Sequence, residues 1–144
     1  MKKSVIALEQ WLQSAPKLIK WGLVFVWYGV IFTLSHIPAA TSASTQVMVG
    51  GDDTLNAVAR FCAHLGVFGV LGLLVYAALA PSLEWKRRTF ALSLAAVIVF
   101  AVSDEVHQAY VPGRHARLQD VLTDTAGAAL CIYALTSLRR RIQR

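Results

Sequence analysis

The amino-acid sequence predicts an all-α membrane protein: a four-helix bundle preceded by a short interfacial helix, with both termini in the cytoplasm. Hydrophobic residues make up 56% of the chain and charged residues 15%, whereas soluble domains average about 45–50% and about 25%. The hydrophobic residues are gathered into four long runs, and the mean hydropathy is +0.54. At 144 residues the chain forms one domain, which we expect to comprise residues 1–144.

The pattern of apolar residues in the segment 4–14 predicts a short amphipathic helix at the membrane surface. Its apolar side chains fall on one face: Val5, Leu8, Trp11 and Leu12. Pro16 ends this helix. A helix of this kind lies along the inner surface of the membrane with its tryptophan at the level of the lipid head groups; the alternative is a frayed chain end.

Four apolar runs follow, at approximately 18–36, 60–83, 89–110 and 118–138, and a helix that spans a bilayer needs about 20 residues. The first run could instead be a signal peptide cleaved near Ala40, but it is long for that and starts late. In the second run, glycines at positions 66, 69 and 72 predict a thin strip for close helix packing. The fourth run has small residues at positions 126–129.

The distribution of charge predicts the topology. Basic residues gather near the N-terminus, at 84–88 and at 139–144, whereas 37–59 contains no lysine and no arginine. Because cytoplasmic segments are enriched in Lys and Arg, we expect a multi-pass protein of the inner (plasma) membrane with both termini inside. In this topology Arg114 and Arg117 lie on the outer side of the membrane, but the basic residues on the cytoplasmic side outnumber them. The net charge of +6 arises from the membrane flanks, so we expect no nucleic-acid partner.

Ionisable residues interrupt the last two apolar runs at their outer ends. The uncharged parts, 89–103 and 125–138, reach only about 21–23 Å at about 1.5 Å per residue, short of the bilayer core of about 30 Å. The segments 104–108 and 120–124 must supply the missing turn, which places their carboxylates in the outer leaflet. Ionisable residues at this depth indicate a functional site. The alternative is that the bilayer is locally thinner, so that these residues stay in contact with water.

The spacing of these residues predicts a polar cluster to which all four helices contribute. Positions 104, 105 and 108 share one helix face, and positions 120 and 124 lie one turn apart. Histidines mark the outer ends of the first two runs, and Pro112-Gly113 predicts a turn between the last two. The candidate catalytic residues are Asp104, Glu105 and His64, and the candidate ligand-binding residues are Arg60, Gln108, Arg114, Arg117, Asp120 and Asp124.

On these residues the chain resembles the VanZ-like family of small bacterial membrane proteins. The shared elements occur in order over roughly residues 20–138: His64, Asp-Glu-x-x-Gln at 104–108, Pro-Gly-Arg at 112–114, and Asp120 with Gly127. The chain departs from the family at Phe61, where lysine is frequent, at Arg117, where a small hydroxyl residue is common, and at Asp124, where asparagine is usual. The resemblance implies a link to glycopeptide (teicoplanin) resistance for some members, without a mechanism.

Three hypotheses for the function stay open. As a non-enzymatic envelope factor, the cluster binds a membrane lipid or a lipid-linked cell-wall precursor, or locks the bundle through buried ion pairs such as Arg114 with Glu105. A membrane enzyme would use Asp104, Glu105 and His64 for acid–base chemistry on such a substrate, with arginines holding its phosphate or carboxylate. A proton-coupled carrier would use the carboxylates, but four helices leave little room for alternating access unless the chain forms a homo-oligomer.

Motifs for nucleophilic catalysis and for metal binding are missing. The chain has no Gly-x-Ser-x-Gly and no His-Glu-x-x-His, and His64, His107 and the carboxylates lack the regular spacing of a metal site. We therefore expect no metal and no other cofactor. Cys62 lies near the end of one run and Cys131 well inside another, so we expect both thiols to be free.

Overall fold

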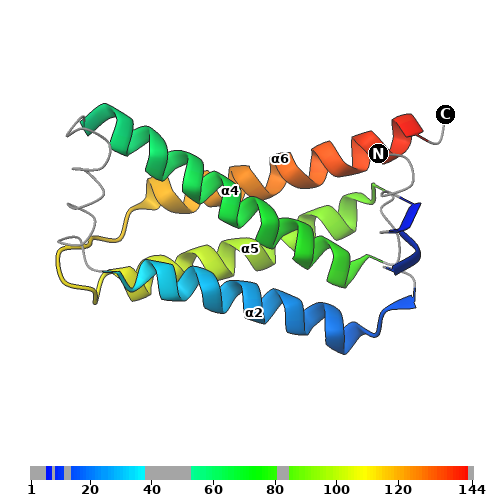
Figure 1. Ribbon diagram of the computed structural model, residues 1–144, viewed down its shortest axis with the longest axis horizontal. Helices are drawn as coiled ribbons and strands as arrows, with labels where there is room; N and C mark the ends of the chain where they lie inside the picture. Colours follow the sequence, from blue (N-terminus) through cyan, green and yellow to red (C-terminus); the bar gives the residue numbers. More distant parts are fainter. Residues whose placement is uncertain (1–5, 8, 12–13, 38–52, 81–84, 143–144) are drawn as a thin grey trace.

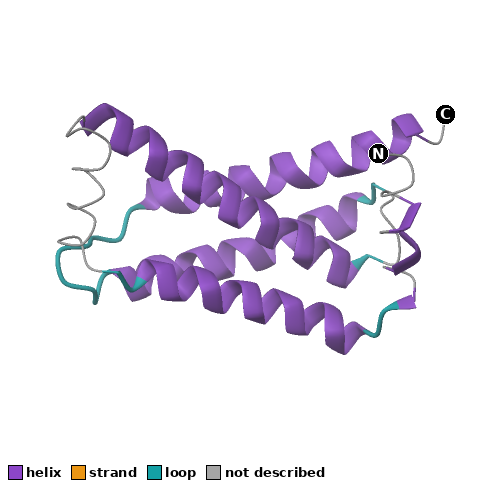
Figure 2. Cartoon of the chain, viewed as in Figure 1, coloured by secondary structure: helices purple, strands orange, loops and turns teal. Residues whose placement is uncertain are grey.

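The computed structural model describes residues 6–7, 9–11, 14–37, 53–80 and 85–142. Four long helices form an antiparallel bundle (Figure 1): α2 (Lys17–Ser35), α4 (Asp53–Leu79), α5 (Arg87–Gln108) and α6 (Leu118–Ile142). These ranges contain helices and turns but no strand (Figure 2). All four helices are long and apolar enough to cross a membrane, which confirms the predicted all-α bundle of four spans.

Two helices extend beyond the apolar runs that are visible in the sequence. α4 begins at Asp53, ahead of the second apolar run, which the sequence predicts to begin at residue 60. No glycine or proline lies between Asp53 and Gly66, so the local sequence does not stop the helix at the membrane boundary. α6 continues through the arginines at 139–141 to Ile142, because arginine is a good helix former and cations are favourable at a helix C-terminus.

The start of α2 and the end of α6 lie at one end of the bundle, together with the end of α4 and the start of α5 (Figure 1, right). This end carries the basic starts of α2 and α5 and the basic last turn of α6. The Nε atom of Arg139 lies 2.7 Å from Oε1 of Glu9. This ion pair ties the N-terminal segment, which is helical at 6–7 and 9–11, to α6, a contact that the sequence did not predict.

Cysteine labelling will test the orientation of the bundle in the membrane. The native thiols of Cys62 and Cys131 are both free, so the background is Cys62→Ser, Cys131→Ala. On intact cells an impermeant maleimide should label cysteines introduced at position 115 and at position 45, which lies outside the described residues. Cysteines at positions 86 and 142 should react only after the membrane is opened, because we expect the basic end to face the cytoplasm. Labelling of position 86 on intact cells would reverse this orientation.

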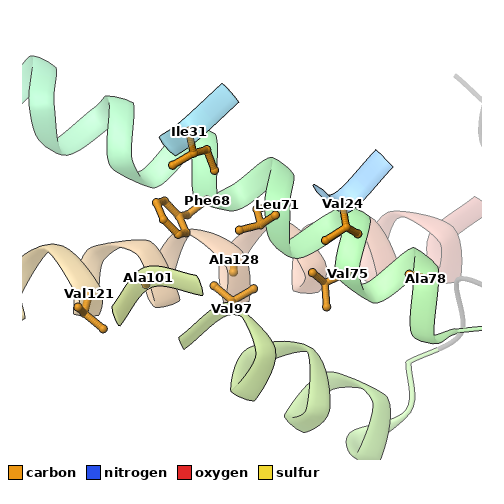
Figure 3. Packing of buried hydrophobic residues seen from close by; sticks show 10 residues of the cluster. All are labelled: Val24, Ile31, Phe68, Leu71, Val75, Ala78, Val97, Ala101, Val121 and Ala128. Atoms are coloured by element: carbon orange, nitrogen blue, oxygen red, sulfur yellow. The ribbon is translucent and has the colours of Figure 1, made fainter. Parts of the chain in front are cut away.

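The hydrophobic core lies along α4, which packs against all three other helices. Its buried side chains Phe68, Leu71 and Val75 pack in one cluster with Val24 of α2 and Val97 of α5 (Figure 3). Many other large apolar side chains face outward, among them Leu18, Phe25, Val26, Val99, Leu122 and Leu130. So much exposed apolar surface is typical of a protein in contact with a membrane.

α4 and α6 make the most extensive contact in the bundle, and they approach each other through small residues. A Cβ added at Gly69 would lie 2.6 Å from Sγ of Cys131, and one at Gly72 would lie 2.5 Å from Cβ of Ala128. The predicted glycine strip is therefore confirmed at these two positions but is wrong at Gly66, where an added Cβ meets nothing within 4 Å. The reason is geometric: three residues fall about 60° short of a full helical turn, so glycines 66 and 72 point in different directions.

Candidate functional site

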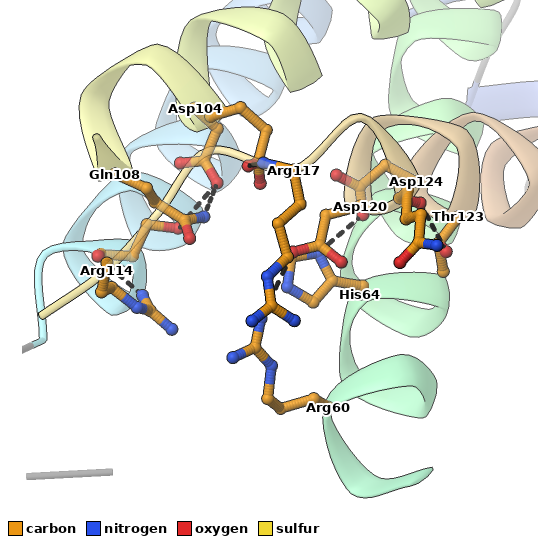
Figure 4. Close-up of polar contacts among 12 residues, drawn as sticks. Arg60, His64, Asp104, Gln108, Arg114, Arg117, Asp120, Thr123 and Asp124 are labelled. Carbon is orange, nitrogen blue, oxygen red and sulfur yellow. Dashed lines mark hydrogen bonds and ion pairs between the residues drawn. The ribbon is translucent and has the colours of Figure 1, made fainter. Parts of the chain in front are cut away.

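The end of the bundle opposite the chain ends carries polar side chains from all four helices. α2 and α5 end here, α4 and α6 begin near here, and the loop 109–117 joins α5 to α6 (Figure 1). We call this group the polar cluster (Figure 4); it comprises Ser35, Arg60, His64, Asp104, Glu105, Gln108, Arg114, Arg117, Asp120 and Asp124. The structure thus brings every predicted site residue to one end of the molecule.

Asp104 joins the ends of α2 and α5. Its side chain is 1% exposed, and its Oδ2 atom accepts hydrogen bonds from Oγ of Ser35 and from Nε2 of Gln108, both at 2.8 Å. Gln108 lies one helical turn after Asp104, as the spacing predicted. Ser35 is the last residue of α2, so one carboxylate oxygen holds two helix ends together.

The α5–α6 loop folds back over these helix ends. Gly113, with a φ of 76°, takes the left-handed conformation that the turn requires. Arg114 Nη1 donates a hydrogen bond to the carbonyl oxygen of Ser35 at 2.8 Å. The backbone N–H of Arg117 donates to Oε2 of Glu105 at 2.6 Å. Two contacts in four residues therefore fix the loop above α2 and α5.

The suggested ion pair between Arg114 and Glu105 is wrong, because each residue binds a backbone group instead. Ser35 ends α2, where carbonyl groups lack helical partners and the helix dipole is negative, so its carbonyl attracts the guanidinium. Partial burial, and then the charge of Arg60, lower the pKa of Arg114 below its ordinary value. The guanidinium stays charged, and the structure therefore holds two like charges near each other.

Two contacts, one helical turn apart, join α4 to α6. Arg60 Nη2 lies 3.3 Å from Oδ2 of Asp120, and the two side chains are 42% and 18% exposed. His64 Nδ1 lies 2.9 Å from Oδ1 of Asp124, and these side chains are 15% and 0% exposed. A carboxylate at Nδ1 orients the imidazole and, in the neutral ring, leaves Nε2 as a hydrogen-bond acceptor. His64 is thereby prepared to take up a proton.

Three buried carboxylate oxygens of the polar cluster have no hydrogen-bond partner in the described part of the chain: Asp104 Oδ1, Glu105 Oε1 and Asp124 Oδ2. Among the same described residues, no three His, Cys, Asp or Glu side chains come together in a group that could hold a metal ion. Buried polar atoms without partners are rare and costly. The cluster therefore keeps unused hydrogen-bonding capacity beneath its surface.

A cavity of about 160 Å³ lies between α2, α4, α5 and the loop that carries Arg114. We call it the amphipathic cavity, because one part of its wall is polar and the rest is apolar. The polar part is formed by Ser35, Arg60, His64, Asp104, Gln108 and Arg114, and the apolar part includes Ile31, Leu34, Val67 and Phe68. Near it, Trp27 Nε1 donates to the carbonyl oxygen of Val67 at 2.9 Å, which fixes α2 against α4.

A second hollow, of about 290 Å³, lies between α4 and α6. We call it the polar recess, because most of its lining side chains are polar or charged: Arg60, His64, Arg117, Gln119, Asp120 and Thr123. Arg60 and His64 also line the amphipathic cavity. These two side chains are therefore shared by the walls of the two hollows.

The three candidate catalytic residues fall into two groups. His64 and Asp104 line the amphipathic cavity, whereas Glu105 lines neither hollow and holds the loop through Arg117. Sequence reasoning missed the part played by Ser35, which contributes both its hydroxyl and its carbonyl oxygen. The available signal was a small polar residue at the end of the first apolar run.

An aromatic group lies beside the polar cluster, between the ends of α2 and α5. His36 Nδ1 lies 3.2 Å from Nε2 of His107, and the ring of His107 stacks on Phe32 with centroids 3.8 Å apart. None of these three residues lines the amphipathic cavity or the polar recess. His107 therefore supports the packing of α2 on α5.

The comparisons with known proteins return one family. A family model described as VanZ/LLP1 matches residues 20–139, a range that contains the whole polar cluster. No curated protein and no solved structure matches the chain.

Proposed function

The chain belongs to the VanZ/LLP1 family, and from this premise we propose that it is a bacterial inner-membrane protein whose polar cluster binds the anionic head group of a lipid or of a lipid-linked cell-wall precursor. The observation that carries the proposal is the amphipathic cavity, which combines an apolar wall with a polar wall that contains two guanidinium groups, those of Arg60 and Arg114. Ligand sites are typically apolar pockets with a few convergent polar groups. A charged head group joined to hydrocarbon matches both walls.

The distribution of charge within the cluster supports an anionic ligand. The carboxylates of Asp104, Glu105 and Asp124 are buried, at 0–4% exposure. In the described residues, neither Arg114 nor Arg117 forms an ion pair with a carboxylate. Guanidinium groups bind phosphate and carboxylate through paired hydrogen bonds. Two guanidinium groups without a carboxylate partner therefore line the hollows, beside the carboxylates of Asp104 and Asp120.

The position of the cluster at the ends of the apolar helices suits a head group at the membrane surface. With the expected orientation this surface is the outer leaflet. A protein that holds a lipid-linked precursor there would change how much of that precursor a glycopeptide antibiotic can reach. Through such a site the protein would alter teicoplanin susceptibility.

A second candidate function is acid–base catalysis on the same kind of ligand, and the contact between His64 and Asp124 favours it. A buried carboxylate that orients a histidine beside a cavity is an arrangement that serves proton transfer. His64 lines both hollows, so it would be the catalytic residue and Asp124 the positioning residue. Asp104, whose Oδ2 is already engaged by two donors, would orient Ser35 and Gln108.

Titration of the purified protein with dioleoyl phosphatidate in neutral detergent micelles will test the proposed binding function. Arg60→Gln should weaken binding about tenfold, because a hydrogen bond to a charged group contributes about 1.5–3 kcal/mol and 1.4 kcal/mol corresponds to a factor of ten. Arg88→Gln is the matched control, since Arg88 is also exposed but lies at the opposite end of the bundle. Equal affinity of the wild type and Arg60→Gln would contradict the proposal.

The same samples separate binding from catalysis. Mass spectrometry of the lipid after incubation should show a product with the wild type and none with His64→Gln if the second candidate is right, since glutamine can bond Asp124 but cannot take up a proton. Unchanged lipid together with intact binding would assign the cluster to binding alone.

A further inference from the structure

The amphipathic cavity and the polar recess share two lining residues, Arg60 and His64, and are therefore adjacent. Ligand pockets begin at roughly 300 Å³, and the two hollows measure about 160 and 290 Å³. The amphipathic cavity alone is therefore too small for a ligand of ordinary size, which would extend from it into the polar recess. We call the position of Arg60 and His64, between the two hollows, the junction.

The two sides of the junction differ in chemistry. On the cavity side, Val67 and Phe68 offer apolar surface. On the recess side, Gln119, Asp120 and Thr123 offer hydrogen-bonding groups. A ligand that satisfies both sides has hydrocarbon on one side and hydroxyl or amino groups on the other.

Three guanidinium groups lie at or beside the junction, together with the carboxylates of Asp104 and Asp120. Arg60 lies at it, Arg114 lines the cavity side and Arg117 lines the recess side. The side chain of Arg117 extends toward that of Arg60 (Figure 4). Among the described residues, Arg117 bonds a carboxylate only through its backbone N–H. Like charges held together repel, so an anion between these guanidinium groups would relieve the repulsion.

We propose that the ligand is a lipid whose phosphate carries a second, polar substituent. The phosphate lies at the junction, the hydrocarbon leaves along the amphipathic cavity, and the substituent fills the polar recess. There Asp120, which Arg60 contacts at 3.3 Å, accepts hydrogen bonds from the substituent. This inference rests on the proposed function and narrows it: a phosphomonoester lipid would leave the polar recess empty, whereas a phosphodiester or diphosphate with a hydroxyl- or amino-bearing head would fill it.

Competition between two lipids with the same chains tests the inference on the purified full-length protein in neutral detergent. Dioleoyl phosphatidylglycerol carries a hydroxylated substituent, and dioleoyl phosphatidate carries none but has more negative charge. We expect the wild type to bind phosphatidylglycerol at least about fivefold more tightly than phosphatidate. The hydrogen bonds that the hydroxylated substituent adds should outweigh the weaker attraction of its smaller negative charge. Equal affinities, or tighter binding of phosphatidate, would overturn the inference.

Filling the polar recess supplies the second arm of the experiment. Thr123→Phe should lower the affinity for phosphatidylglycerol about tenfold and leave phosphatidate unchanged. Leu122→Phe is the matched control, because Leu122 is 62% exposed and lines neither hollow; it should change neither affinity. Gln119→Trp fills the recess from an exposed position and replaces Thr123→Phe if that variant does not fold.

The outcomes distinguish this inference from the proposed function. If Arg60→Gln weakens the binding of both lipids but filling the recess affects them equally, the proposed function stands and the polar substituent is refuted. If neither affinity depends on Arg60, both proposals fail together.

Discussion

Gly127→Ala is expected to destabilise the bundle strongly, although it adds a single methyl group. The new Cβ would overlap the backbone carbonyl group of Leu65 on α4. A backbone carbonyl within a helix cannot move aside as a side chain can, so α4 and α6 would have to separate along their contact. Overpacking costs about 1–3 kcal/mol where neighbours can yield, and we expect a loss at or above the upper end of that range.

Thermal unfolding of the purified protein in detergent, followed by circular dichroism, will measure this effect against two other glycines. Gly66→Ala is the matched control, because nothing lies within 4 Å of its added Cβ. It should be as stable as the wild type or more so, since alanine exceeds glycine in helix propensity by about 1 kcal/mol. Gly69→Ala should fall between the two, because its nearest neighbour is the Sγ atom of Cys131 at 2.6 Å, which can rotate away. Gly127→Ala protein that unfolds together with the wild type would refute the close contact.

The four spans could be predicted from the sequence because hydropathy reports directly on the membrane-crossing part of each helix. The ends of the helices could not be predicted from hydropathy, because a helix continues past its apolar run until a residue such as glycine or proline ends it. α4 accordingly begins at Asp53, ahead of the apolar run. The glycine repeat predicted close packing in general. Which glycines take part depends on the direction from which α6 approaches, and that direction is not encoded in the spacing of one helix.

The gathering of the polar cluster at one end of the bundle could also be predicted, because its charged residues interrupt the last two apolar runs at the ends that the α5–α6 loop joins. The cluster residues Asp104 and Asp124 are 1% and 0% exposed. Their partners could not be predicted with the same success. Arg114 was expected to reach Glu105, its nearest carboxylate along the returning chain, but it bonds the carbonyl end of α2. That acceptor comes from a distant segment, so only the packed bundle reveals it.

His64→Leu is expected to destabilise the protein more than Asp124→Leu, although the two side chains share one contact. The carboxylate of Asp124 is 0% exposed, and its Oδ2 has no partner in the described part of the chain. Without His64, its Oδ1 also loses its partner, so the buried carboxylate has none. Removing one member of a buried pair costs about 3–5 kcal/mol. Without Asp124, the imidazole of His64 still faces two hollows, where a small ligand or water can bond it, so we expect about 1–2 kcal/mol.

The double variant His64→Leu, Asp124→Leu should recover much of the stability that His64→Leu loses, because replacing a whole buried pair by apolar residues is often close to neutral. Thermal unfolding of all four proteins in the same detergent forms a double-mutant cycle, and strictly additive losses would show that the two residues are not coupled. The folded double variant then decides what the pair contributes. If the double variant binds phosphatidate as tightly as the wild type does, the pair stabilises the fold, and the ligand is bound by Arg60 rather than by His64. If binding is lost in a protein that is otherwise stable, the imidazole itself belongs to the ligand site, which is the result that acid–base chemistry at His64 requires.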